Sequence, residues 1–418
     1  MAVGSEVLGT ATTGYIWPII HDYILPGCQE EFYNQTFLLD QIKSSSKDVN
    51  GRQILIKHKL WRNRNAGSFT ERGLLPQAKS RGFKESSEKL KFFSVQVDFS
   101  GQELALCKGK AQHIDLIADG FEDAMKGGLE EMNFIFWNNG TARRCQCNVD
   151  STYAAGTGLT TVTFDGGSPL WMFARMDVTF GTDTTAYEVI SVADDGLSFT
   201  VQGDATAVAL DDAYVYRNGG YIATLDKDPN GLSLHCNTVN QGVSGLYQGL
   251  DRTAAGNEWL KAYVNGAYGD AILMTELLLM KHIRTHKAKT GEYPDFIVTD
   301  PPTFTSYVLL LKSGSVGTDY VVDEAGFKKD VKFIYAGQQM TLRVADDCWA
   351  QSMYFLTRKA LEIREGKKFG WDMMGGGKLK VDKDTDTYWG RMLWYLNLIC
   401  LDPKKLSVLA GVKPDAIT

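Results

Sequence analysis

The stretches RQILIKHKLW, residues 52–61, and LKFFSVQVDF, residues 90–99, decide how this chain is interpreted. Apolar and polar side chains alternate in both, which is the pattern of β-strands with one buried face. We therefore predict two strands that together form a ribbon. The alternating positions are Ile54, Ile56, His58 and Leu60 in the first stretch, and Phe93, Val95, Val97 and Phe99 in the second.

Residues 62–87, between these strands, contain three glycines, Pro76 and almost no periodic apolar pattern. A connection this long does not fit inside a compact domain, so residues 52–100 are predicted to be an extended β-hairpin loop that projects from the body. An isolated two-stranded ribbon is only marginally stable in water, so we expect a neighbouring subunit to complete it. The charged side chains expected at that contact are Arg62, Arg64, Glu71, Arg72, Lys79, Arg81 and Lys84.

The 418 residues carry a formal net charge of −6, and 44% of them are hydrophobic, as in ordinary folded proteins. The acidic balance argues against a sequence-specific DNA binder, which needs a dense basic face. Residues 1–13 show no features of a signal peptide, and no apolar run is long enough to predict a membrane span. Seven scattered cysteines favour free thiols made in a reducing cytosol.

Two helices are predicted around the hairpin loop. Residues 1–51 form an N-terminal arm with a short helix from Gln29 to Ile42. Residues 101–149 contain a second, long helix at 110–137, where apolar residues recur three and four positions apart on one face. Gly127 and Gly128 lie in the middle of this helix, where glycine costs stability. They indicate a bend or a close approach of another backbone.

Residues 150–217 are predicted to form a small all-β insertion domain. Short alternating runs, separated by turn signals such as Asp165-Gly166-Gly167, are typical of such modules. The segment 150–216 holds ten acidic residues and one basic residue, Arg175. This acidic module contrasts with the basic segment 62–87 of the same chain.

Residues 218–390 show a mixed α/β pattern, and residues 391–418 add a C-terminal strand and tail. Asp270 is predicted to cap a helix that runs to about Lys289, with Gly291 as its stop. Pro301-Pro302 opens a second helix. Short strands are expected at 296–298, 331–335, 340–344, 354–356 and 361–364, and 392–401 is apolar on both faces, as in a central strand.

Several patterns suggest binding chemistry, and each has a simpler structural reading. His282 and His286 have zinc-ligand spacing, but basic residues surround them, which favours a solvated basic helix end. Cys145 and Cys147 lack a second cysteine pair, which favours free thiols. The run Tyr388, Trp389, Trp394 and Tyr395, together with Trp171 and Phe173, favours core packing over a glycan platform.

Two further motifs are incomplete. Gly375-Gly376-Gly377-Lys378 lacks the upstream glycine and the Ser or Thr of a phosphate loop, so it is interpreted as a flexible turn. Asp382, Asp384 and Asp386 lack the glycine and terminal glutamate of a calcium loop, so they are interpreted as a solvated turn. No recognisable nucleophile with a partner histidine is present. We therefore expect no metal, no cofactor and no enzymatic activity.

The order of parts, from arm through charged hairpin loop, long helix and β insertion to α/β domain, resembles the major capsid protein family of tailed bacteriophages. That fold is shared with encapsulins and with the floor of herpesvirus capsids. Local stretches add to the resemblance, in the order in which they occur. They are Gly245-Leu246-Tyr247, Leu250-Asp251-Arg252 with Trp259, the run from Gly291 to Thr299, and Tyr335-Ala336-Gly337 before Met340.

The resemblance implies an α+β capsid fold with a spine helix at about 110–137, a peripheral domain around it and an axial domain at 218–390. It implies a virion subunit that self-assembles into pentamers and hexamers of an icosahedral shell around double-stranded DNA. Assembly would take place in the host bacterial cytoplasm without a membrane or covalent cross-links. A separate scaffolding protein, a portal and decoration proteins would be its partners. An encapsulin-like compartment, or a hydrolase or glycan-binding protein, are the alternatives.

Overall fold

The computed structural model describes most of the chain from residue 38 to residue 413. The described residues are 38, 41–42, 44–47, 49–61, 67–71, 73, 82–102, 110–167, 171–194, 198–218, 221–222, 225–240, 245–267, 270, 272–313, 330–335, 337–372, 379–381 and 385–413. The predicted N-terminal arm and most of its helix lie outside these residues. Leu38 and Ile42, at the end of that predicted helix, are buried in the main core.

A five-stranded sheet forms the centre of the molecule, and β22 (Thr387–Cys400) is its main strand. One edge of β22 pairs antiparallel with β5 (Lys91–Ser100), and β20 (Leu361–Trp371) and β21 (Leu379–Val381) also pair with it. The short β1 (Ser44–Ser45) adds to β20. The central strand predicted at 392–401 is confirmed. β22 is hydrogen-bonded to partners along its length, and most of its buried apolar residues belong to the largest core cluster.

The long helix predicted at 110–137 is confirmed as α5 (Lys110–Trp137), which packs along β5. Its two central glycines differ in their surroundings. A Cβ added to Gly128 would lie 2.6 Å from Cγ2 of Val95 on β5, whereas one added to Gly127 would meet nothing within 4 Å. A close approach therefore occurs at Gly128 alone, and the neighbour is a side chain of β5 where another backbone was expected.

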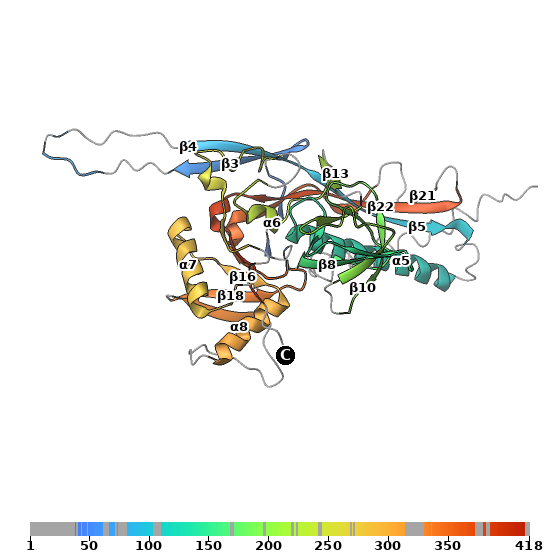
Figure 1. Cartoon of the computed structure of the whole chain (residues 1–418). Helices are drawn as coiled ribbons and strands as arrows, with labels where there is room; N and C mark the ends of the chain where they lie inside the picture. The colour runs from blue at the N-terminus through green and yellow to red at the C-terminus, as the bar shows by residue number, and fades with distance from the viewer. Residues whose placement is uncertain are drawn as a thin grey trace, which may run out of the picture.

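The hairpin loop differs from its prediction in how its strands pair. β3 (Gln53–Trp61) pairs antiparallel with β4 (Gly82–Lys89), and β2 (Val49–Asn50) lies on the other edge of β3. The predicted second strand, 90–99, is β5 and belongs to the central sheet. The sequence of β4, GFKESSEK, shows no apolar alternation, so the pattern does not predict a strand there, and most of β4 lies in the predicted connection 62–87. Figure 1 shows the β3–β4 pair along one side of the molecule.

The segment predicted as an all-β insertion forms a seven-stranded sheet with its own core. It begins earlier than predicted, because residues 143–147 form its first strand. The strands are β6 (Arg143–Cys147), β7 (Thr152–Ala154), β8 (Leu159–Gly167), β9 (Asp177–Phe180), β10 (Tyr187–Val192), β11 (Ser198–Gln202) and β12 (Tyr214–Arg217). A small pair, β13 (Tyr221–Ile222) and β14 (Leu225–Asp226), and the short helix α6 (Leu232–His235) follow it.

A six-stranded sheet with two helices forms the third unit. Its order is β15, β23, β19, β16, β18, β17. Figure 1 places α7 and α8 with it, at the lower left. The bounds are β15 (Tyr263–Asn265), α7 (Glu276–Thr290), β16 (Phe296–Thr299), α8 (Pro301–Ser313), β17 (Asp330–Tyr335), β18 (Gln338–Val344), β19 (Ser352–Leu356) and β23 (Ser407–Ala410), with single 3-10 turns at Glu258–Leu260, Arg358–Ala360 and Pro403–Lys405.

The start of α7 was predicted wrongly. Thr275 caps the helix, because its side chain accepts a hydrogen bond from the Leu278 N–H at 3.2 Å. Asp270 instead accepts a hydrogen bond from the Ala267 N–H, outside the helix. The stop at Gly291 is confirmed, and its φ of 82° is the left-handed conformation that glycine adopts readily. Within the described residues, no helix is both long and apolar enough to cross a membrane.

The two glycines of α5 provide a matched test of this packing. We expect Gly127→Ala to stabilise the chain by up to about 1 kcal/mol, since alanine favours the helix. Gly128→Ala should instead destabilise it by about 1 kcal/mol or more, because buried Val95 is branched at Cβ and has little freedom to turn aside. Urea denaturation of both variants measures the difference. Equal stabilisation by both substitutions would contradict the close packing of α5 on β5.

Candidate functional site

Of the residues predicted for contacts between subunits, the structure describes Glu71 and Lys84. Arg62, Arg64, Arg72, Lys79 and Arg81 lie outside the described residues. Glu71 is exposed. Lys84 is half-buried, and its Nζ donates a hydrogen bond to Oδ1 of Asn257, 2.7 Å away in the same chain. The structure therefore gives Lys84 a partner within its own body, and the contact with another subunit stays a prediction.

The base of the hairpin is attached to the body by His58 of β3. Its Nδ1 lies 2.9 Å from the carbonyl oxygen of Leu401, and its Nε2 lies 2.7 Å from Oγ of Ser86 on β4. The ring also packs against Trp259 at 4.7 Å between centroids. Burial lowers the pKa of His58, although the Leu401 carbonyl and Asp402 act in the opposite direction. The neutral ring thus joins both hairpin strands to the end of β22.

Apolar packing supports the same attachment. Ile54, Ile56 and Leu90 form a separate small core with Ile399 of β22. The Ser87 N–H donates to the carbonyl of Gln248 at 3.2 Å. The strands of the hairpin are therefore stabilised by the chain's own body, through a small core shared with β22.

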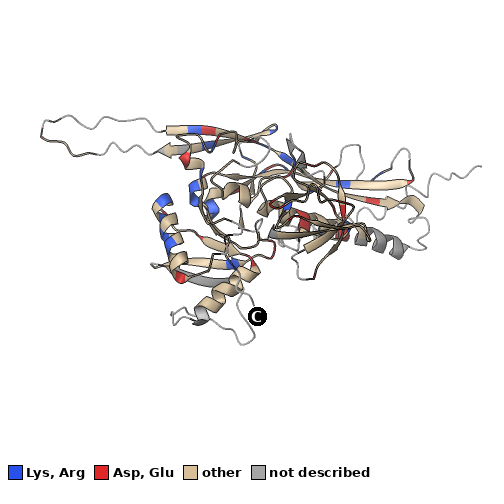
Figure 2. Cartoon of the chain, viewed as in Figure 1, with Lys and Arg blue, Asp and Glu red and all other residues tan. Residues whose placement is uncertain are grey.

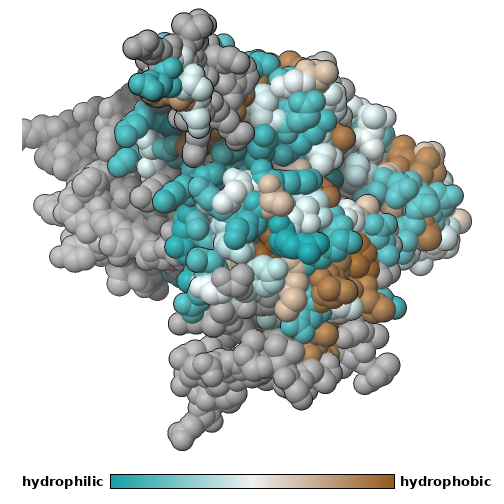
Figure 3. All heavy atoms as spheres, turned by 90° about the vertical axis from the view of Figure 1, so that its left-hand side faces the viewer, coloured by the Kyte–Doolittle hydropathy of each residue, from teal (hydrophilic) through white to brown (hydrophobic). Residues whose placement is uncertain are grey.

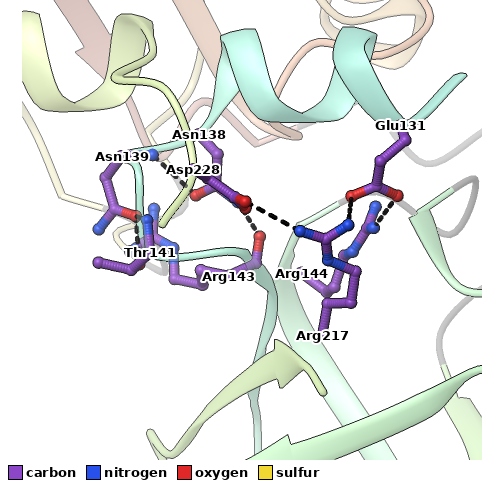
Figure 4. Close-up of polar contacts among 8 residues, drawn as sticks. All are labelled: Glu131, Asn138, Asn139, Thr141, Arg143, Arg144, Arg217 and Asp228. Carbon is purple, nitrogen blue, oxygen red and sulfur yellow. Dashed lines mark hydrogen bonds and ion pairs between the residues drawn. The ribbon is translucent and has the colours of Figure 1, made fainter. Parts of the chain in front are cut away.

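A buried ion network joins α5 to the insertion domain (Figure 4). Glu131 of α5 pairs with Arg144 of β6 through one oxygen and with Arg217 of β12, at 2.9 Å, through the other. Arg217 also pairs with Asp228 at 2.8 Å. β6 and β12 are the strands by which the chain enters and leaves the insertion domain. One carboxylate therefore holds both crossings against the helix.

Aromatic rings and a polar turn complete this junction. The Arg143 guanidinium lies 4.2 Å from the ring centre of Trp349, and that of Arg144 lies 5.0 Å from Phe134. The turn after α5 is closed by side chains, because Asn138 donates to the carbonyl of Arg143 and Asn139 accepts from Thr141. The insertion domain is thus held rigidly and does not hang from flexible linkers.

Solved structures with a similar fold include a phage capsid. The capsid of cyanophage A-1(L) matches with a TM-score of 0.51 and 14% sequence identity, over 90% of this chain and 93% of that one. The chain has a phage capsid fold. No family model and no curated protein matches the sequence.

Two other solved structures match this chain with lower TM-scores. The capsid of a native GTA particle has 9% identity and a TM-score of 0.46, over 90% of this chain and 89% of that one. The holo-SrpI encapsulin complex from Synechococcus elongatus PCC 7942 has 8% identity and a TM-score of 0.40, over 92% and 90%. At these identities the likeness concerns the fold.

Within the phage capsid fold, His282 and His286 are not the solvated pair that the sequence predicted. Both are fully buried, and both lie within 3.0 Å of Oγ of Ser407 on β23. Burial lowers the pKa of His282 to about 3 and that of His286 to about 4. Helical spacing placed the two rings on one face, but only the packing shows that this face points inward. Lys281 and Arg284 are exposed, as the basic surroundings suggested.

The other candidate motifs are structural where the chain is described. Cys145 and Cys147 are buried thiols of β6. Trp394 and Trp171 are fully buried, as predicted, whereas Phe173 is largely exposed. Residues 375–378, Asp382 and Asp384 lie outside the described residues, and Asp386 is exposed. No group of three metal-ligating side chains occurs among the residues that the structure describes.

Sequence reasoning missed the network around Arg252 within the Leu250-Asp251-Arg252 stretch. Arg252 is fully buried and lies 3.5 Å from the ring centre of Tyr247, and its Nη1 donates to the carbonyls of Leu234 and Val239. The Tyr247 hydroxyl lies 2.8 Å from Nδ1 of His235. The only signal in the sequence is a single arginine two positions after Leu250, which does not distinguish a buried arginine from an exposed one.

The first expected outcome concerns Glu131. Glu131→Gln should lower the free energy of unfolding by about 3 kcal/mol, because the buried Arg144 guanidinium then loses its counter-charge. Glu130→Gln, at the exposed neighbouring position, is the control and should change stability by less than about 0.5 kcal/mol. Urea denaturation measures both. Similar stability of the two variants would show that the network does not secure the insertion domain.

A second expected outcome is that the stability of the chain depends on pH through Asp228. Burial raises the pKa of Asp228 to about 6, against the opposing effect of Arg217. A carboxyl group in the unfolded chain titrates near pH 4. The stabilising contribution of protonated Asp228 is therefore complete below about pH 4 and is lost as the pH rises through about 6. Asp228→Asn should remove this loss. Free energies of unfolding measured across that window should fall less with rising pH in the variant, and an unchanged dependence would contradict the assignment.

Proposed function

We propose that the chain is a major capsid protein, a subunit that self-assembles into an icosahedral shell. The observation that carries this proposal is the phage capsid fold, which extends over 90% of the chain. The activity is association between copies, and no catalytic step is needed for it. The strands of the β3–β4 hairpin are firmly attached to the body, which supports a contact made by the charged segment between them.

The energetics of such a shell favour many weak contacts over one strong contact. Each subunit repeats the same surfaces around a closed symmetric particle, so modest contacts add up. The hairpin contributes through its charged residues and through strand edges that a neighbour can pair with. The attachment at His58 and Ile54 keeps the hairpin base in place before contact. Less conformational entropy is then lost when a neighbour binds.

Further details of the proposal follow the resemblance of the chain's parts. α5 is the spine helix, the central sheet belongs to the peripheral domain, and the six-stranded sheet with α7 and α8 belongs to the axial domain. The subunits form pentamers and hexamers in the virion capsid, assembled in the host bacterial cytoplasm. A separate scaffolding protein, a portal and decoration proteins are the expected partners. The shell encloses double-stranded DNA without sequence-specific binding, consistent with the net negative charge.

Electron microscopy of the purified chain tests this function directly. We expect capsomers or closed shells. The triple variant Arg62→Ala/Arg64→Ala/Arg72→Ala should fail to form them or lose them at moderate salt, because the hairpin contact is electrostatic. The control removes the same charge from exposed lysines elsewhere, as Lys359→Ala/Lys368→Ala/Lys413→Ala, and should still assemble.

Two results would change the proposal. A monomeric wild-type chain under all assembly conditions would refute it. Normal shells from the arginine variant would remove the hairpin charges from the mechanism. Nuclease-protected double-stranded DNA in native particles distinguishes a phage shell from an encapsulin-like compartment.

A further inference from the structure

The insertion domain carries a compact surface patch that is both acidic and apolar. Residues 147–151 and 209–213 run side by side, since the Ser151 N–H donates to the Ala209 carbonyl and the Asp212 N–H donates to the Cys147 carbonyl. Two apolar side chains of these segments are exposed to solvent, with exposed fractions of 51% for Val149 and 47% for Leu210. The exposed carboxylates beside them are Asp150, Asp211 and Asp212. We call these five residues the acidic patch.

The acidic patch is fixed in shape by its own hydrogen bonds. Oδ1 of Asp150 accepts from the Asp211 N–H at 2.9 Å, which joins the two segments. Asp212 has a φ of 62°, and its Oδ1 accepts from the Gln146 side chain at 3.0 Å. A rigid surface loses little entropy on binding. Exposed leucine and valine on such a surface favour burial against another protein surface.

A surface of the opposite charge lies on α7. Leu277 in its first turn is 76% exposed, and Leu273 just before the helix is 64% exposed. Lys281 and Arg284 follow Leu277 by four and seven positions, so they lie on the same face of the helix and are exposed. The opposite face is buried through Leu279 and Ile283. We call Leu273, Leu277, Lys281 and Arg284 the basic face.

The figures place this face on an outer side of the molecule. In Figure 2 basic residues cluster along α7. Figure 3, which views the molecule from the side where α7 lies, shows hydrophobic surface bordered by hydrophilic surface. Figure 1 places α7 at one end, well separated from β8 and β10 of the insertion domain. The helix of the basic face and the sheet of the insertion domain therefore lie on different parts of the molecule.

We propose that the basic face of one subunit docks on the acidic patch of a second copy of this chain. Each surface offers exposed apolar side chains beside charges of one sign, and the signs are opposite. Because the two surfaces differ and lie on different parts of the molecule, the contact is head-to-tail and continues from copy to copy, as in a ring. The inference rests on the proposed shell function and names a second contact for it, separate from the hairpin.

Charge exchange tests the contact. Lys281→Glu/Arg284→Glu alters the basic face, and Asp211→Lys/Asp212→Asn alters the acidic patch while keeping a residue that tolerates left-handed backbone at 212. Each variant should raise the concentration needed for assembly by about ten-fold or more, since opposed like charges disfavour docking. Combining both sets in one chain should restore assembly toward the wild-type level. Light scattering and sedimentation velocity provide the readout.

A matched control and the contrary outcomes complete the design. Lys359→Glu/Lys413→Glu makes the same charge change at exposed lysines away from both surfaces and should assemble normally. If either altered variant assembles like the wild type, or if the combined variant is as defective as its parents, the docking contact is refuted. Restored assembly in the combined variant also shows that all the substitutions are compatible with folding. Failure of the wild-type chain to assemble would instead refute the shell function itself.

Discussion

The end of β22 is the point on which the rest of the structure depends. Buried backbone and amide groups must find hydrogen-bond partners, and residues 397–401 take theirs from distant parts of the chain. Asn397 donates to the carbonyl of Lys89 and accepts from the N–H of Asn230. The carbonyls of Leu398, Cys400 and Leu401 contact the side chains of His235, Gln248 and His58. The hairpin and the segment after the insertion domain are therefore positioned by one strand.

This arrangement suits the proposed shell function, which needs a rigid subunit. The hairpin base and the insertion domain each have a small core of their own. Each is also tied to the centre by buried polar contacts, at His58 in one case and at Glu131 in the other. The strands of the hairpin and the insertion domain are therefore held in fixed directions on the body. Fixed directions are what a closed particle needs, because angular errors accumulate from copy to copy.

The two proposed contacts differ in physical character. The hairpin contact relies on arginines and lysines near an exposed strand edge, so salt screens it strongly. The contact between α7 and the insertion domain adds exposed leucine and valine side chains to its charges, so part of its free energy comes from apolar burial and is less sensitive to salt. A shell that uses both kinds of contact keeps some cohesion when the ionic strength rises.

The sequence by itself determined the elements whose periodicity is strong and local. These are the long helix α5, the strands β8 to β12 of the insertion domain, the central strand β22 and the stop of α7 at Gly291. Their apolar spacing or glycine chemistry depends on nearby residues alone. The order of these elements was also enough to suggest the capsid fold.

Only the tertiary structure decided which surfaces meet. β4 has a polar sequence and becomes a strand because β3 offers it a partner. The face carrying His282 and His286 is inward because β23 lies against it. The cap of α7 is Thr275, and the chain before it is held at Ile272, whose N–H donates to the carbonyl of Gly411. The Glu131 network joins residues far apart in the chain. Such choices depend on contacts between distant segments, whose free energies no local pattern contains.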